Sequence, residues 1–470
     1  MPRIYISAAH KSSGKTTLSI GLCAALTKNN LIIQPFKKGP DYIDPLWLSK
    51  ASGRDCHNLD FNTQLSDEIL VTLQHYSQGA DMSLIEGNLG LYDGMALDGS
   101  DSNAAVAKLT KSPVVLVIDT RGVTRGVAPL LLGYQQFDKD INIAGVIYNM
   151  SNGGRHETKL IAVTKEYTDI PVLGVVKKNP LMVVDERHLG LMPSNENKQA
   201  TQKINDIARI VADSVDLESL IKTAKSAAKL ENKVPLNLNV INTKNKKKAK
   251  VRLGICEDSA FGFYYAGDKL ALENAGAELV SFSALEDDQL PENLDGLFIG
   301  GGFPETHMDQ LAENTSMRKS IYQAIEDGLP TYVECGGLMY LSQNLHWNGK
   351  SSLMVGIIPA DAQMYEKPQG RGYVKLEETN DMPWDKLEVC KSDKKIIRAH
   401  EFHYSQLDDY AAMKAKGKFA YKVHRGVGIT GDNDGWVYKN LLANYSHMRE
   451  TSHFHWASRF VSFVKSKKIK

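Results

Sequence analysis

The sequence has little cysteine, no strong net charge and no long apolar run. Its five cysteines among 470 residues include no Cys-x-x-Cys pair, which argues against a disulfide framework and a structural zinc site and fits a reducing cytoplasm. A net charge of +1 gives no electrostatic reason to expect nucleic acid or a membrane surface as a partner. No apolar stretch is long enough to span a bilayer, and the first residues lack a secretory-signal pattern. We therefore expect a cytoplasmic protein.

Length and pattern divide the chain into two α/β domains. A chain of 470 residues exceeds what one core usually supports. In the first half, short apolar strands alternate with helices, which predicts a mostly parallel sheet with helices on its faces. There we expect a helix over 15–28 and strands over 3–8, 31–36, 83–86, 113–119, 143–148 and 172–175.

The composition changes in the middle of the chain. The segment from Lys244 to Lys250 is strongly basic and has no apolar period, so it is either an anion-binding patch or, as we favour, a solvated linker. We expect a first domain over 1–200, a helical segment with this basic linker over 201–250, and a second α/β domain over 251–470. In the second domain we expect strands over 251–256, 296–300 and 331–334.

A short loop in the first domain has the pattern of a phosphate site. Ser12-Ser-Gly-Lys-Thr-Thr17 follows a strand and opens a helix, where backbone N–H groups and the helix dipole favour phosphate. The loop departs from the usual pattern, because Ala9 stands where a glycine normally opens it. A plain Ser/Thr helix cap is the alternative, but the strand–loop–helix context favours nucleotide. The predicted nucleotide contacts are Gly14, Lys15, Thr16 and Thr17, with the Thr16 hydroxyl on Mg²⁺.

Two acidic clusters support this prediction. The segments 36–45 and 84–94 each follow a strand, and the carboxyl ends of parallel strands are where ligands bind in open α/β folds. Each carboxylate taken singly is typical of a surface turn, but their shared placement favours a site. Glu86 is a suitable Mg²⁺ partner beside Thr16, and Lys37 can neutralise phosphate charge.

The second domain contains a candidate nucleophile. Thr331-Tyr-Val-Glu-Cys-Gly-Gly-Leu-Met-Tyr340 predicts a strand, then Cys335 at a sharp turn, then a helix. Small neighbours allow such a turn to expose the side chain, and a helix N-terminus favours the reactive thiolate. A buried structural cysteine before a glycine turn is the alternative.

Two other segments supply what a thiolate nucleophile needs. The glycine run in Phe298-Ile-Gly-Gly-Gly-Phe-Pro-Glu305 leaves backbone N–H groups for an oxyanion, so we assign Gly302 and Gly336 to that role. A thiolate also needs an imidazole as base and acid. His453 and His455 near the C-terminus point to the same side of an extended segment, and we choose His453.

These residues together resemble the cobyrinic acid a,c-diamide synthase family, whose members carry a glutamine amidotransferase domain of the cobyric acid synthase type. The resemblance covers nearly the whole chain. Its most specific strings are Gly39-Pro-Asp-Tyr-Ile-Asp-Pro45 and His400-Glu-Phe-His-Tyr-Ser405. It implies a P-loop NTPase-like, dethiobiotin synthase-like first domain and a class I glutamine amidotransferase-like second domain, both α/β.

The resemblance also implies a mechanism. Cys335, assisted by His453, would release ammonia from glutamine, while ATP with Mg²⁺ would phosphorylate a carboxylate of a tetrapyrrole substrate for ammonia to displace. We name a homodimer as a candidate assembly, although the sequence does not determine the oligomeric state. No acid follows His453 at the two-residue spacing of other glutamine amidotransferases, so we assign no third triad member. By family match, substrate contacts are Asp41, Tyr42 and Asp44, metal contacts are Thr16, Asp41 and Glu86, and the adenine contact is Asn149.

Other interpretations concern the substrate and the class of function. The loop from Ala8 to Gly14 and the string Cys56-His-Asn-Leu-Asp60 look like the family branch thought to amidate sirohaem. A corrin precursor is therefore the default substrate, and sirohaem or a sirohydrochlorin is the rival. A nucleotide-dependent switch protein with an inactive amidotransferase domain is a hypothesis of another class. Carboxylation of the dethiobiotin synthase type would leave half the chain unexplained.

Overall fold

The computed structural model describes residues 1–187, 190–196, 199–231, 251–385 and 396–468. It forms two compact units, Met1–Leu236 and Asn237–Lys470. The predicted basic linker from Lys244 to Lys250 lies outside the described residues, as does Cys390. Within the described ranges, we find no helix with both the length and the apolar character needed to cross a bilayer.

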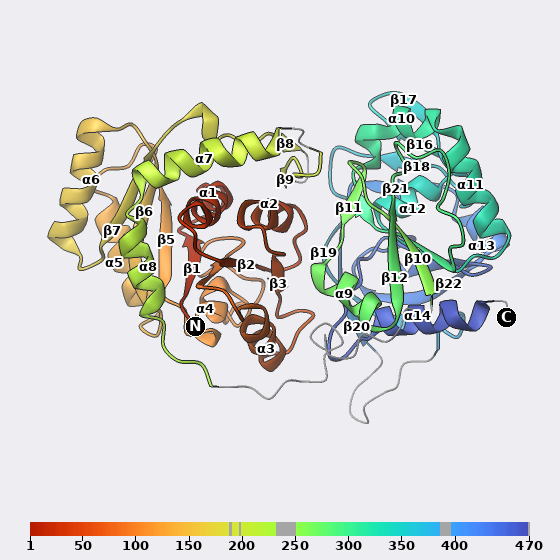
Figure 1. Cartoon of the computed structure of the whole chain (residues 1–470), viewed down its shortest axis with the longest axis horizontal. Helices are drawn as coiled ribbons and strands as arrows, with labels where there is room; N and C mark the ends of the chain where they lie inside the picture. The colour runs from red at the N-terminus through yellow and green to blue at the C-terminus, as the bar shows by residue number, and fades with distance from the viewer. Residues whose placement is uncertain (188–189, 197–198, 232–250, 386–395, 469–470) are drawn as a thin grey trace. The chain divides into compact units, whose positions relative to one another are not determined.

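A parallel seven-stranded sheet forms the centre of the first unit, in the order β3-β2-β4-β1-β5-β6-β7 (Figure 1). Strands such as β5 are runs of Val, Leu and Ile buried on both faces, as parallel sheets between helices require. The predicted strands are confirmed to within two or three residues, and β3 was not predicted because it is short. The strands are β1 (Arg3–Ala8), β2 (Ile33–Lys38), β3 (His57–Leu59), β4 (Met82–Glu86), β5 (Val114–Asp119), β6 (Ile143–Ser151) and β7 (Val172–Lys177).

The order of these strands places the ligand-binding edge. Strand β1 pairs with β4 on one side and β5 on the other, so consecutive strands lead away from it in opposite directions. Such a switch point opens a crevice at the carboxyl ends of the strands. The loop after β1, together with the ends of β2 and β4, lies at this edge.

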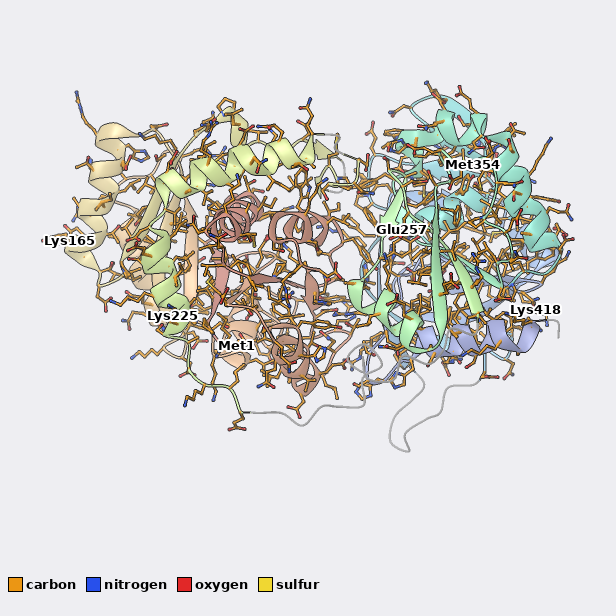
Figure 2. All side chains as sticks on the ribbon, in the orientation of Figure 1. Met1, Lys165, Lys225, Glu257, Met354 and Lys418 are labelled. Carbon is orange, nitrogen blue, oxygen red and sulfur yellow. The ribbon has the colours of Figure 1, made fainter. Side chains whose placement is uncertain are left out.

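Helices cover the sheet of the first unit. They are α1 (Lys15–Lys28), α2 (Ile43–Ser52), α3 (Ser66–Tyr76), α4 (Asn103–Leu109), α5 (Val127–Phe137), α6 (Gly154–Tyr167), α7 (Ala200–Ser214) and α8 (Leu217–Lys225). Lys165 and Lys225, labelled in Figure 2, lie in the last turns of α6 and α8. Cations there complement the negative end of the helix dipole.

Helices α7 and α8 belong to the first unit, so ending the first domain at residue 200 was too early. Helix α7 packs closely on α1: a Cβ on Gly21 of α1 would overlap Val211 of α7. Burial of Ile204, Ile207 and Val211 along one face of α7 explains the docking. The remaining short elements are a 3₁₀ turn (Pro180–Met182) and the hairpin strands β8 (Glu186–Arg187) and β9 (Gly190–Leu191).

A mixed nine-stranded sheet forms the centre of the second unit, in the order β12-β10-β13-β15-β24-β23-β22-β19-β20 (Figure 1). The half from β12 to β24 is parallel, and the other half is antiparallel. The strands are β10 (Val251–Cys256), β12 (Ala277–Phe282), β13 (Gly296–Ile299), β15 (Thr331–Glu334), β19 (Gly370–Glu378), β20 (Ile396–His403), β22 (Lys418–Arg425), β23 (Asn433–Tyr438) and β24 (Leu441–Asn444).

The predicted strands of the second unit belong to the parallel half, and β10 and β15 have the predicted bounds. Smaller sheets pair β11 (Phe261–Phe263) with β14 (Gly301–Gly302), and β17 (Lys350–Leu353) and β18 (Ala362–Met364) with β16 (Asn344–Trp347), β18 also pairing with β21 (Ser405–Leu407). The helices are α9 (Ala266–Asn274), α10 (Met308–Glu313), α11 (Thr315–Glu326), α12 (Gly336–Leu341), α13 (Tyr410–Lys416) and α14 (Trp456–Lys467), with a 3₁₀ turn over Pro304–His307.

Candidate active sites in the two units

The first unit carries a phosphate-type loop between β1 and α1. Two of its residues have left-handed backbone, Ser12 at φ 63° and Gly14 at φ 80°. A Cβ on Gly14 would overlap Nδ2 of Asn149, so both the backbone and the neighbour require glycine there. That Nδ2 donates a 2.9 Å hydrogen bond to the Ser13 carbonyl. Asn149, near the end of β6, therefore holds the loop in position. Its contact with adenine stays a prediction.

Three carboxylates surround the Lys37 ammonium at the ends of β2 and β4. Lys37 Nζ lies 2.9 Å from Glu86 Oε1 and 3.7 Å from Asp41 Oδ2, and it forms a shorter ion pair with Asp44. The Thr16 hydroxyl, with one proton to donate, lies 2.7 Å from the same Glu86 oxygen and 3.1 Å from Asp44 Oδ2. The structure thus brings together five residues predicted to bind nucleotide, metal or substrate.

Burial and charge oppose each other in this cluster. Burial lowers the pKa of Lys37, but the carboxylates of Asp44, Glu86 and Asp41 together raise it by a larger amount. The net shift of the pKa is therefore upward. Burial and the neighbouring charge of Asp44 raise the pKa of Asp41 to about 7. Burial and the positive charge of Lys37 lower the pKa of Lys15 to about 8. A bound polyanion would favour the charged form of Lys15, whereas the neighbouring carboxylates already favour the charged form of Lys37.

The same residues fit a divalent cation that also binds phosphate oxygens. Glu86 is fully buried, and its Oε2 makes no hydrogen bond within the described part of the chain. The Thr16 hydroxyl lies beside the other Glu86 oxygen. Among the described residues, no group of three or more His, Cys, Asp or Glu could hold a metal ion. Thr16 and Glu86 fit Mg²⁺, which usually takes one or two carboxylates and completes its shell with phosphate and water.

The remaining predicted residues of the first site lie around the start of α1 and α2. Asp41 Oδ1 accepts hydrogen bonds from the N–H groups of Ile43, at 2.9 Å, and Asp44, at 3.1 Å. One oxygen of Asp41 is therefore used to hold the first turn of α2, and Oδ2 faces Lys37. The Tyr42 side chain is buried, and Thr17 is half-buried in the first turn of α1.

The second unit contains the predicted nucleophile elbow. Cys335 joins β15 to α12 with φ 47° and ψ −102°, a left-handed backbone that a non-glycine residue adopts only at a cost of about 1–3 kcal/mol. Cys335 is 6% exposed, and its backbone N–H donates to the Asn444 carbonyl at 2.8 Å. Strain held by surrounding structure at a strand-to-helix turn is typical of a catalytic nucleophile.

The glycine run lies against this elbow. A Cβ on Gly336 would stand 2.9 Å from the Gly302 nitrogen, and a Cβ on Gly337 would stand 2.5 Å from the Ile299 carbonyl oxygen. Both positions therefore need glycine because the backbones approach so closely. The two residues predicted for the oxyanion hole, Gly302 and Gly336, are brought together.

The histidine at the nucleophile is His447, and the choice of His453 is not supported by the geometry. His447 is buried and hydrogen-bonds to Cys335. His453 is exposed to solvent, and His455 contacts Glu450 at 2.9 Å. The physical reason is strand register. Because β15 pairs in parallel with β24, with Glu334 opposite Asn444, the residues just after Asn444 pass the elbow.

The surroundings of His447 favour its charged form. Burial lowers its pKa, but the negative charge of Cys335, a hydrogen bond to Cys335 and the contact with Glu334 outweigh burial and raise the pKa to about 10. Its Nδ1 lies 3.3 Å from Glu334 Oε2, which leaves Nε2 for the sulfur. The arrangement therefore places an imidazolium beside the sulfur, the environment that a catalytic cysteine needs because the thiolate is the form that attacks carbonyl carbon.

The string His400–Ser405 lies beside this histidine. The His400 and His447 rings stack with centroids 4.9 Å apart. The backbone N–H of His447 donates a 2.8 Å hydrogen bond to the backbone carbonyl of His400. Burial and the charge of His447 hold the pKa of His400 well below its usual value. The His403 ring stacks on Tyr445 with centroids 3.9 Å apart. The string thus packs two imidazoles against the segment that follows β24.

Comparison with known proteins matches each unit to a known domain family. The CobQ/CobB/MinD/ParA nucleotide binding domain matches residues 5–191, and the CobB/CobQ-like glutamine amidotransferase domain matches residues 252–453. The cobyrinate a,c-diamide synthase of Magnetococcus marinus is 42% identical, covering 98% of this chain and 97% of its own. Those of Picrophilus torridus and Methanosarcina acetivorans are 39% and 37% identical, covering 97% and 98% of this chain and 98% and 95% of their own.

The chain belongs to the cobyrinate a,c-diamide synthase family. This confirms the resemblance carried by the specific strings, and it confirms an α/β fold with a nucleotide-binding domain followed by an amidotransferase domain.

Two residues of this family member were missed from the sequence, His447 and Glu334. A usable signal existed for His447, because it lies three residues after the apolar strand Leu441–Asn444, where a parallel strand delivers side chains to the ligand edge. No local signal marks Glu334, which reads as the last residue of a strand before the nucleophile.

Proposed function

We propose that this chain is an ATP-dependent, glutamine-hydrolysing ligase that converts the a- and c-side-chain carboxylates of cobyrinic acid into amides. The observation that carries the proposal is the strained Cys335 elbow with His447 at its sulfur. It stands in a chain whose other unit holds a phosphate-type loop and an acidic cluster. Relatives named cobyrinate a,c-diamide synthase over nearly the whole chain support the substrate.

The second unit would liberate ammonia. The Cys335 thiolate attacks the side-chain amide carbon of glutamine, and the N–H groups of Gly302 and Gly336 stabilise the oxyanion that forms. His447 gives a proton to the departing nitrogen, which leaves as ammonia. The acyl group of glutamine remains on the sulfur of Cys335 as a thioester. Water then attacks the thioester while the neutral imidazole takes a proton from that water. The carbon–sulfur bond breaks, and glutamate leaves.

The first unit would activate the acid. A carboxylate is a poor acyl donor, so a substrate carboxylate first takes the γ-phosphoryl group of ATP, and ammonia then displaces phosphate to give the amide. Lys15 and Lys37 neutralise phosphate charge at this step. Thr16 and Glu86 would hold Mg²⁺, which would supply further charge neutralisation at the phosphates. The ion pairs of Lys37 with Asp41 and Glu86 hold these three side chains in position before ATP and the substrate bind.

Mass spectrometry of the products tests the proposal. The protein is incubated with ATP, Mg²⁺ and glutamine, and with cobyrinic acid or sirohaem in parallel. Each amidation replaces OH by NH₂, so two successive products from cobyrinic acid are expected, with neither formed by Cys335→Ala supplied with glutamine. Products from sirohaem alone would move the assignment to the sirohaem-amidating branch. Absence of glutamate release with every tetrapyrrole would favour the nucleotide switch and overturn the ligase.

A further inference from the structure

We propose that Glu334, the residue immediately before the nucleophile, is the carboxylate that positions His447 for glutamine hydrolysis. The inference rests on the glutaminase activity proposed above and adds a third side chain to it. Glu334 touches the imidazole and not the reacting carbon, so it is a positioning residue.

The geometry around Glu334 is that of a carboxylate held in one orientation. It is 3% exposed, and its Oε2 lies 3.3 Å from His447 Nδ1. Its Oε1 accepts a hydrogen bond of 2.6 Å from the Tyr332 hydroxyl and one of 2.8 Å from the Met448 N–H. The Tyr332 hydroxyl in turn accepts one of 3.1 Å from Asn444 Nδ2. With both oxygens engaged, the carboxylate cannot rotate away from the ring.

The contacts also fix what the imidazole can do. A carboxylate at Nδ1 holds the proton on that nitrogen and leaves Nε2 for the sulfur and the leaving ammonia. Because Met448 donates its backbone N–H to the same carboxylate, the backbone beside His447 is held as well. A buried, uncompensated imidazolium would be costly, and Glu334 supplies the opposite charge within the interior.

Other charged groups near His447 do not take this place. The residue two positions after it, where other glutamine amidotransferases carry the acid, is Arg449, whose guanidinium lies 5.0 Å from the Tyr265 ring centroid. Glu450 contacts His455. Among the described residues, Cys335 and Glu334 at the end of β15 and His400 from β20 face His447. The charge of Glu334 also raises the pKa of Asp268, and the charge of Arg449 lowers the pKa of His400.

A purely structural role is the competing explanation, because a buried carboxylate with several donors also stabilises the fold. The two explanations differ in the pH profile. The charge of Glu334 favours the imidazolium, so removing it lowers the pH at which His447 loses its proton. The alkaline limb of kcat/KM for glutamine then moves to lower pH, which a loss of folding stability alone would not produce.

The experiment compares Glu334→Gln with the parent protein and with Glu378→Gln, all as full-length chains hydrolysing glutamine across a pH series. Glu378 is a matched control, because it is a half-buried residue whose side chain is 8% exposed and whose carboxylate pairs with Arg459 at 2.6 Å and not with an imidazole. For Glu334→Gln we expect kcat to fall roughly 10- to 100-fold with KM little changed, and the alkaline limb to move to lower pH. For Glu378→Gln we expect a lower Tm with the parent pH profile.

Two further results decide the inference. If Glu334→Gln does not fold, Glu334→Asp replaces it. This variant keeps the negative charge, but its shorter side chain draws the oxygens away from His447. It should therefore keep the alkaline limb of the parent while kcat falls. Parent kcat and pH profile in whichever of these variants folds would overturn the positioning role while leaving the glutaminase intact. A parent protein that releases no glutamate would instead overturn both the inference and the proposed function beneath it.

Discussion

Replacing His447 by Asn should abolish nearly all glutamine hydrolysis, while the same replacement at His453 should not. Asn keeps a polar side chain in the buried position but provides no group that titrates near neutral pH. His447 contacts both Cys335 and Glu334, whereas His453 is exposed. The two variants therefore separate the histidine selected by the tertiary structure from the one suggested by the sequence.

The size of the loss follows from the two tasks of His447. A thiol at its ordinary pKa of about 8.5 is only about one tenth ionised at pH 7.5, so losing the imidazolium partner costs roughly tenfold in thiolate. Losing the proton donor to ammonia costs roughly a further 10²- to 10⁴-fold. We therefore expect kcat/KM for glutamine to fall by about 10³- to 10⁵-fold.

Glutamate release at pH 7.5 over a range of glutamine concentrations measures this loss. Amidation driven by ATP and an ammonium salt serves as the folding control. It should persist in His447→Asn, because the first unit is unchanged. His453→Asn should stay within about twofold of the parent, as exposed substitutions usually do. A severe loss in His453→Asn with parent activity in His447→Asn would refute the assignment of the base.

The first unit gives three further predictions. Lys15→Ala should abolish ATP-dependent amidation while glutamine hydrolysis is partly retained, and equal loss of both activities would show tighter coupling of the two units. Nucleotide binding should take up protons above pH 8, because burial lowers the pKa of Lys15 to about 8 in the free protein and phosphate restores its charged form. Affinity should therefore weaken as the pH rises through about 8, which calorimetry in buffers of different ionisation enthalpy would detect. Gly14→Ala should lower the free energy of unfolding by about 1–3 kcal/mol and weaken ATP binding, because the new Cβ would overlap Asn149. Gly53→Ala is the control, because Gly53 also has a positive φ, of 71°, but no heavy atom of the described residues lies within 4 Å of the new Cβ. This variant should lose only the free energy of the strained backbone in urea unfolding, and it should bind ATP as the parent does.

The two reactive loops could be predicted from the sequence because each is encoded within about ten consecutive residues. The run Ser12–Thr17 has its glycine where φ is 80°, and helix α1 has the predicted bounds. The Cys335 turn likewise has its small residues where backbones come closest. Local steric rules act between near neighbours, so a single stretch of sequence is enough to reveal them.

His447 had only its position after an apolar strand as a sequence signal, and the carboxylate that holds it could not be read from the sequence. The same applies to the docking of α7 on α1, which extended the first unit beyond the predicted boundary. Glu334 and His447 are 113 residues apart, and they meet because β15 and β24 pair in one register. The sequence by itself determined the two chemistries and the fold class. The tertiary structure decided the partners, because strand pairing and helix packing are set by contacts between distant segments.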